Sequence, residues 1–108
     1  MSHYGAEKVV EDYNVMGPEK AAPESAVRYL AYELGPRGIR VHAISPGPVK
    51  IGAASGIDHL ERAAARAPTR RLVSIEDVGV ATAVLAIDYA KLITGEKVYV
   101  DGGYHILG

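Results

Sequence analysis

Apolar residues recur every three or four positions between Asp12 and Leu34, a spacing that places them on one face of a helix. The residues that follow this spacing are Val15, Met16, Ala22, Ala26, Val27, Leu30, Ala31 and Leu34. We therefore expect an amphipathic helix over roughly this range. The run Gly35-Pro36-Arg37-Gly38 is typical of a helix end and stops it.

A strand and a short helix are predicted next. Residues 39–45 are β-branched at three positions and are bounded by turn residues on both sides, which favours a strand. The run Ser45-Pro46-Gly47-Pro48 ends that strand. Residues 58–66 are charged and rich in alanine, and Pro68 follows them, so we expect a short helix there.

Another helix and a last strand complete the pattern. Ser74 and Asp77 stand three positions apart, as in a capping box, and acidic side chains favour the positive end of a helix dipole. The strongly apolar stretch 78–87 that follows predicts a buried helix. Residues 97–101 are predicted as a strand, closed by the turn Gly102-Gly103.

The order of long helix, strand, short helix, helix and strand is typical of parallel βαβ units in a doubly wound α/β sheet. A length of 108 residues, of which 48% are hydrophobic, fits one domain over residues 1–108. Sheets of this class are buried on both faces and contain more than two strands. We therefore expect an apolar edge that needs a pairing partner.

Charge and composition exclude several classes of function. Lys and Arg total 12 against 13 for Asp and Glu, so the net charge of -1 gives no basic surface for nucleic acid or an anionic membrane. No uncharged run approaches the length of about 20 residues that a membrane span needs. The sequence has no cysteine, which fits a cytoplasmic protein. The 4 histidines are scattered, and we expect no metal site.

Tyr13, Met16 and Lys20 share one face of the predicted long helix. An ammonium near a phenol lowers the phenol pKa and donates a hydrogen bond, so such a pair can stabilise an oxyanion formed by hydride addition. A tyrosine and a lysine on one helix face are also common as solvent-exposed residues without a function. Their spacing alone does not decide between these interpretations.

The surrounding residues favour the catalytic interpretation. The run Tyr13-Asn14-Val15-Met16-Gly17-Pro18-Glu19-Lys20-Ala21-Ala22 resembles the active-site helix of enoyl-(acyl carrier protein) reductases. The resemblance continues in order to Val100-Asp101-Gly102-Gly103-Tyr104 and covers essentially the whole chain. Its most specific element is Tyr-x6-Lys, since the wider short-chain dehydrogenase/reductase superfamily has Tyr-x3-Lys. A literal Tyr-x3-Lys at Tyr4 and Lys8 is interpreted as a decoy, because only Lys20 opens the long helix.

The resemblance implies a Rossmann-like fold, NADH as cofactor and an enoyl thioester on acyl carrier protein as substrate. Tyr13 and Lys20 would be the catalytic pair, with Tyr13 stabilising the enolate and Lys20 binding the nicotinamide ribose. The residues that the resemblance assigns to the cofactor are Lys20, Ile44, Pro46, Gly47 and Val49. Those that it assigns to the substrate are Tyr4, Tyr13, Met16, Ala53 and Ala54. The family is also expected to form homo-oligomers, tetramers at full length.

Departures from the family pattern limit what we expect of the isolated chain. A glycine-rich strand-to-helix turn, which holds the pyrophosphate in a Rossmann half, is missing, so the amino-terminal cofactor half is expected to be absent. His3 stands in the place of a second family tyrosine, with Tyr4 one residue later. Ile51 replaces a phosphate-contacting threonine, and Pro23 lies inside the predicted helix.

Three hypotheses remain. In the first, the chain is the carboxy-terminal piece of an NADH-dependent enoyl reductase of fatty-acid biosynthesis and is inactive alone. In the second, it belongs to another short-chain dehydrogenase/reductase with a different substrate. In the third, it is a truncated remnant without catalytic activity.

Overall fold

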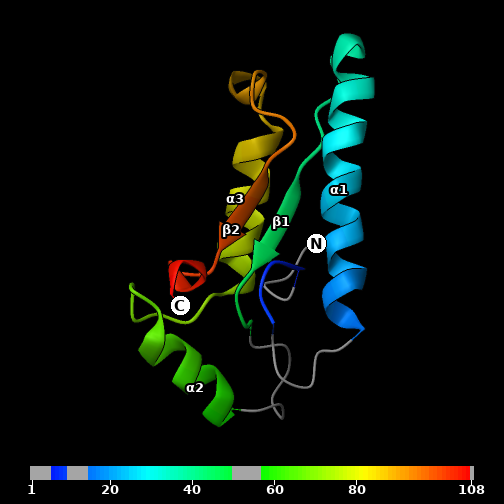
Figure 1. Cartoon of the computed structure of the whole chain (residues 1–108). Helices are drawn as coiled ribbons and strands as arrows, with labels where there is room; N and C mark the ends of the chain where they lie inside the picture. Colours follow the sequence, from blue (N-terminus) through cyan, green and yellow to red (C-terminus); the bar gives the residue numbers. More distant parts are fainter. Residues whose placement is uncertain (1–5, 10–14, 50–56, 108) are drawn as a thin grey trace.

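The computed structural model describes residues 6–9, 15–49 and 57–107 (Figure 1). Within them, three α-helices and two strands follow in the order helix, strand, helix, helix, strand, and short 3-10 turns (η) follow three of these elements. In chain order the elements are α1 (Met16–Leu34), η2 (Gly35–Arg37), β1 (Ala43–Pro46), α2 (Ile57–Arg66), α3 (Ile75–Ala86), η3 (Asp88–Ala90), β2 (Lys97–Val100) and η4 (Tyr104–Ile106).

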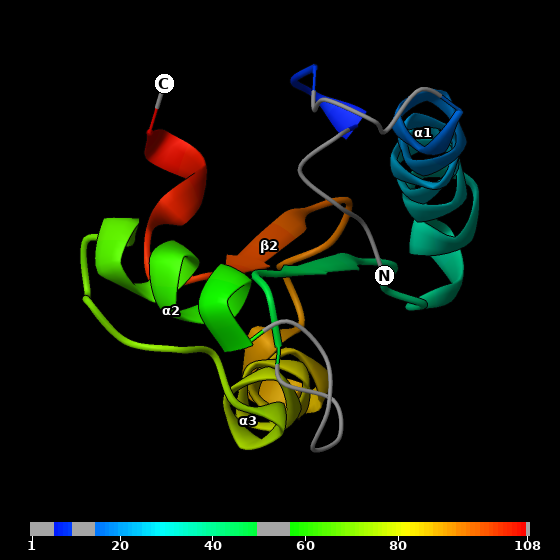
Figure 2. The same ribbon diagram turned by 90° about the horizontal axis from the view of Figure 1, so that it is seen from below.

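The two strands pair in parallel, with Ala43 opposite Lys97 and Pro46 opposite Val100. The chain crosses from one strand to the other through α2 and α3. Helix α1 lies over one face of the sheet and α3 over the other (Figure 2). Helices on both faces of a parallel sheet define the doubly wound arrangement, so the predicted α/β architecture is confirmed.

Strand β1 begins later than predicted, at Ala43 instead of residue 39. The preceding residues do run beside the approach to β2, where the amide of Val41 donates to the Thr94 hydroxyl at 3.0 Å. The amide of Gly95 in turn donates to the carbonyl of Val41 at 2.8 Å. Gly95 has a φ of +78°, a left-handed conformation that a regular ladder does not contain, so strand pairing starts only after it.

Helix α1 continues without a break through Pro23, which lies in its interior, while Pro18 lies in its first turn. It ends at Leu34, as predicted, and passes into η2, where Gly38 closes the turn with a φ of +74°. Residues 12–14 of the predicted helix lie outside the described residues. None of the helices in the described ranges has both the length and the apolar character that crossing a membrane requires.

The start of α3 carries the predicted capping box. The amide of Asp77 donates to the Ser74 hydroxyl at 3.0 Å, and the amide of Ser74 donates to Oδ2 of Asp77 at 2.9 Å. The Ser74 hydroxyl also donates to Oδ2 of Asp77 at 2.9 Å, and the two bonds that Ser74 donates, the one from its amide first, lower the pKa of Asp77. The predicted helix over 58–66 is also confirmed, since α2 spans Ile57–Arg66.

The predicted burial of the apolar helix is wrong for this chain. No residue of α3 is buried, and the side chains of Val80 and Val84 are 64% and 55% exposed. Two strands cover only one side of a helix that is apolar on most of its surface. The core is correspondingly thin and is built largely from small residues; its buried apolar members are Ala31, Ala43, Leu60, Ala67 and Ala90.

Candidate functional site

The first turns of α1 lie at the same end of the molecule as the carboxyl ends of both strands (Figure 1). In open parallel sheets this end is where ligands bind, because helices and loops there leave a crevice beyond the strands. Two predicted site residues, Met16 and Lys20, belong to the first turns of α1. Ile44 and Pro46 belong to β1, and Gly47 and Val49 follow it. The predicted residues that are described therefore gather at one end of the sheet.

Four predicted site residues, Tyr4, Tyr13, Ala53 and Ala54, lie outside the described residues. The pairing of Tyr13 with Lys20 therefore stays a prediction. Ile51 and His3, which mark departures from the family pattern, also lie outside the described residues.

Lys20 is half-buried in α1. Within the described ranges, no acceptor forms a hydrogen bond or ion pair with its ammonium group. Met16, one turn earlier on the same face, is 39% exposed. A methionine and an ammonium on one face of the first turns of α1 can contact an apolar chain and a hydroxyl-bearing group, respectively.

The turn after β1 is held firmly against β2. Ser45 is 2% exposed, and the amide of Gly47 donates to the carbonyl of Val100 at 3.0 Å. Val49 forms a parallel bridge with Val73. A β-carbon at Gly47 would lie 3.0 Å from Cβ of Asp101, so this position has room only for glycine. The backbone of the turn is therefore fixed and free of a side chain at Gly47.

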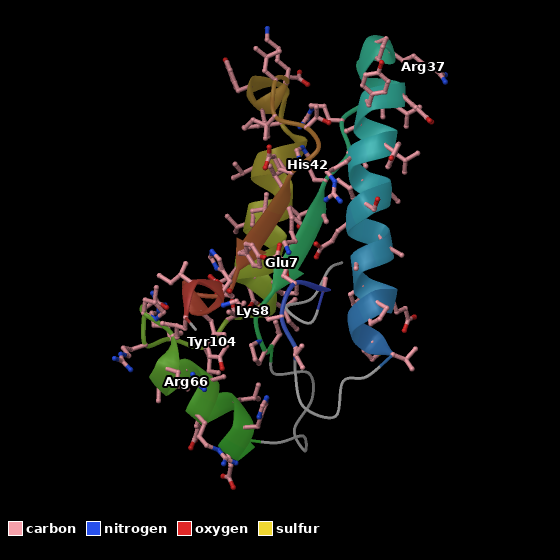
Figure 3. All side chains as sticks on the ribbon, in the orientation of Figure 1. Glu7, Lys8, Arg37, His42, Arg66 and Tyr104 are labelled. Carbon is pink, nitrogen blue, oxygen red and sulfur yellow. The ribbon has the colours of Figure 1, made fainter. Side chains whose placement is uncertain are left out.

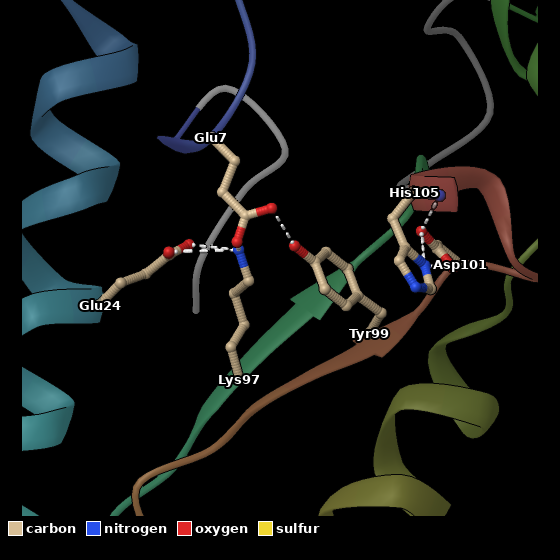
Figure 4. A network of polar contacts seen from close by, with 6 residues as sticks. All are labelled: Glu7, Glu24, Lys97, Tyr99, Asp101 and His105. Atoms are coloured by element: carbon tan, nitrogen blue, oxygen red, sulfur yellow. Dashed lines mark hydrogen bonds and ion pairs between the residues drawn. The ribbon is translucent and has the colours of Figure 1, made fainter. Parts of the chain in front are cut away.

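A polar network lies beside this end of the sheet, on the face that α1 covers (Figure 4). The Nζ of Lys97 lies 2.5 Å from Oε1 of Glu7 and 3.0 Å from Oε1 of Glu24. Burial lowers the pKa of the Lys97 ammonium, but hydrogen bonds, first to Glu7, outweigh that effect and raise the pKa overall. The hydrogen bond from Lys97 also lowers the pKa of Glu7. Lys97 therefore stays charged between two carboxylates.

The network continues along β2. The hydroxyl of Tyr99 donates to Oε2 of Glu7 at 2.8 Å, and its ring stacks on that of His105 with centroids 3.9 Å apart. Nδ1 of His105 lies 3.0 Å from Oδ1 of Asp101. Burial raises the pKa of the Tyr99 hydroxyl, so it remains a donor at neutral pH. Asp101 in turn contacts Gly47, and the network reaches the turn after β1.

Sequence reasoning missed these network residues. Lys97, Tyr99 and Asp101 alternate along the last strand, which places them on one face. Glu24 follows Lys20 by one helical turn. These two spacings show which residues share a face of the strand and of the helix. They do not show that charges in segments about 70 positions apart form a pair. In the described ranges, no three His, Asp or Glu side chains come together as a metal site.

A pocket of about 430 Å³ lies between the start of α3 and the end of β2, and Tyr99, Asp101 and His105 of the polar network line part of it. Its lining includes Arg71, Asp77 and His105. It contains none of the predicted site residues.

Comparison with known proteins places this geometry in a family. The family described as enoyl-(acyl carrier protein) reductase matches residues 1–105. The chain belongs to the enoyl-(acyl carrier protein) reductase family. Its relatives include the NADH enoyl-(acyl carrier protein) reductase FabI of Aquifex aeolicus, 54% identical over 100% of this chain and 42% of that protein. A reductase of the same description from Rhizobium meliloti is 53% identical over 100% of this chain and 41% of that protein. The chain thus spans about 42% of the Aquifex relative that it matches.

Solved structures of such reductases share the fold. The Bacillus cereus enoyl-acyl carrier protein reductase, solved with NADP+ and indole naphthyridinone, superposes with a TM-score of 0.91 at 46% identity, covering 99% of this chain and 43% of that one. The Aquifex aeolicus reductase gives a TM-score of 0.87 at 54% identity, with 99% and 43% coverage. The predicted Rossmann-like fold is confirmed at these identities. A β-ketoacyl-(acyl carrier protein) reductase structure is more distant, at 35% identity and a TM-score of 0.83 over 98% of this chain and 45% of that one.

Proposed function

We propose that this chain supplies the nicotinamide- and substrate-facing part of an NADH-dependent reductase of trans-2-enoyl thioesters carried on acyl carrier protein, in fatty-acid biosynthesis. The observation that carries the proposal is the place of Lys20. Lys20 is half-buried in the first turns of α1, which lie at the same end of the molecule as the carboxyl ends of the strands (Figure 1), and its ammonium has no partner in the described ranges. It also stands seven positions after Tyr13, the spacing typical of this family.

The described residues fit a nicotinamide nucleotide. Lys20 has three N–H donors for ribose hydroxyls. The hydrogen bond from Gly47 to Val100 fixes the backbone after β1, so Ile44, Pro46, Gly47 and Val49 offer a rigid surface for a planar ring. When bound, NADH supplies the hydride that reaches the β-carbon of the enoyl thioester.

The chain's own residues act on the charge that hydride addition creates. The Tyr13 phenol donates a hydrogen bond to the thioester oxygen as it becomes an enolate oxygen, which lowers the barrier because the developing charge is stabilised. Lys20 holds the ribose hydroxyls. Met16 contacts the acyl chain, with Tyr4, Ala53 and Ala54 as further substrate contacts.

Several parts of the proposal concern the whole protein. They are use of NADH, an acyl carrier protein partner, a homo-oligomer and a cytoplasmic location. The apolar side chains of α3 are exposed, which supports the inference that this chain functions only when further protein surface covers them.

The experiment compares two samples. In the first, the 108-residue chain is mixed with NADH and a short trans-2-enoyl thioester, and absorbance at the NADH band is followed. In the second, the chain replaces the matching part of the Aquifex aeolicus reductase. This full-length chimera is called the complemented enzyme below. We expect NADH oxidation only in the second sample. Inactivity of the complemented enzyme would contradict the proposal and favour a non-catalytic remnant.

Variants of the complemented enzyme test the named residues. Tyr13→Phe is expected to lower kcat by about 100-fold or more, because the enolate loses its donor. Lys20→Met is expected to raise KM for NADH. Tyr32→Phe, at a tyrosine that is 85% exposed on α1, is the control and should leave both constants unchanged.

A further inference from the structure

Lys97 joins two segments that the proposed function needs close together. Its ammonium bonds to Glu24, which lies one helical turn after Lys20 on α1. It also bonds to Glu7, in the described segment 6–9 that precedes Tyr13 in the chain. Figure 3 shows Glu7 and Lys8 on the strand side of α1, near the carboxyl ends of the strands. One side chain of β2 thus links the helix of Lys20 to segment 6–9, which precedes Tyr13 in the chain.

We propose that Lys97 is a positioning residue of the reductase site, which holds the segment preceding Tyr13 at a fixed place relative to the helix of Lys20. The inference rests on the proposed function, because it assigns Lys97 a role in that same site. Lys97 acts through Glu7 and Glu24 and does not itself contact substrate or cofactor.

The contacts are strong enough for this role. The side chains of Lys97 and Glu24 are only 13% and 10% exposed, so their ion pair is poorly screened by water. Glu24 binds the ammonium with both oxygens, at 3.0 and 3.2 Å. Loss of the ammonium would remove both of its hydrogen bonds to the nearly buried carboxylate of Glu24.

Glu7 is 53% exposed, but two groups fix its direction. Lys97 bonds one of its oxygens at 2.5 Å, and the Tyr99 hydroxyl bonds the other at 2.8 Å. The neighbouring Lys8 adds an anchor, with Nζ 2.7 Å from the carbonyl oxygen of Leu107. Segment 6–9 is therefore attached to β2 and to the end of the chain through side chains.

A stabilising pair and a positioning pair give different kinetic results. If Lys97 only stabilises the fold, Lys97→Met lowers the amount of folded enzyme and leaves kcat per folded molecule unchanged. If it positions the segment of Tyr13, kcat falls while KM for NADH, which depends on Lys20, stays the same. Lys97→Arg restores activity because guanidinium pairs well with carboxylates.

The test uses the complemented enzyme and the 108-residue chain. In the enzyme, Lys97→Met is expected to lower kcat about tenfold, with KM for NADH unchanged and Lys97→Arg close to wild type. In the chain, amide hydrogen exchange of residues 6–9 is expected to become about tenfold faster in Lys97→Met, while amides of the β1–β2 ladder keep their protection. Lys91→Met, at an exposed lysine beside η3, is the control and should change neither reading.

The outcomes separate the two proposals. An active complemented enzyme whose Lys97→Met variant keeps wild-type kcat overturns the positioning role alone. Unchanged exchange of residues 6–9 in that variant overturns it as well. A wild-type complemented enzyme that fails to oxidise NADH overturns the proposed function, and the positioning role fails with it.

Discussion

Gly47 lies directly against Asp101: a β-carbon on Gly47 would be 3.0 Å from Cβ and 3.1 Å from Cα of that residue. Because Cα and Cβ cannot rotate away, Gly47→Ala has to displace the turn or strand β2. We expect the free energy of unfolding to fall by about 2 kcal/mol. Urea unfolding of the chain followed by circular dichroism measures it. An unchanged midpoint would show that the turn moves freely.

Gly79, on α3, has free space where Gly47 has close neighbours. A β-carbon there would meet nothing within 4 Å, and the residue lies inside the helix. Alanine in a helix interior is more favourable than glycine by roughly 0.5–1 kcal/mol, because the unfolded glycine has more freedom to lose. Gly79→Ala is therefore expected to raise the urea midpoint. A fall would mean that the surface of α3 is covered, for example by another copy of the chain.

Ser74 caps α3 through its hydroxyl, which accepts from the amide of Asp77 at 3.0 Å. Ser74→Ala leaves that amide without its partner and is expected to cost about 1 kcal/mol. Thermal unfolding is a suitable measurement, with Thr82→Ala as control. Thr82 also carries a hydroxyl on α3, but its bond goes to the carbonyl of Val78 inside the helix. Equal effects of both substitutions would contradict a specific cap.

The elements with strong local signals were predicted well from the sequence. The capping box at Ser74, the glycine and proline stop after Leu34, and α2 depend on neighbours within a few positions, so their spacing contains the information. The start of β1 was predicted four residues early because Gly95, far along the chain, interrupts the ladder. Burial of α3 was wrong because apolar composition does not reveal how many strands cover a helix.

The residues of the candidate site also differ in how far the sequence predicts them. Lys20 and Gly47 were predicted as site residues from short runs of consecutive residues that resemble the family, and their roles stay predictions. Lys97 was missed because its partners, Glu7 and Glu24, come from two other segments. A lysine in a short strand predicts exposure, and only the packing of α1 against the sheet makes this one nearly buried.

Glu7 makes the free energy of unfolding of the chain depend on pH in the acid range. The hydrogen bond from Lys97, followed by that from Tyr99, lowers the pKa of Glu7 below its ordinary value of 4.5. Between the lowered pKa and 4.5 the unfolded chain binds more protons than the folded chain, so stability rises with pH in that window. The contribution of Glu7 is therefore fully present above the ordinary value and is lost as pH falls through the lowered one.

Comparison of wild type with Glu7→Gln measures this contribution. Above pH 5 we expect the wild type to be the more stable of the two in urea unfolding, and we expect the difference to shrink as the pH is lowered below 4.5. Lys97 stays protonated over the entire range, so the change reports Glu7 alone. Glu61→Gln, at an exposed glutamate of α2, is the matched control and should show no such convergence. A difference that stays constant down to strong acid would mean that Glu7 gains nothing from its contacts with Lys97 and Tyr99.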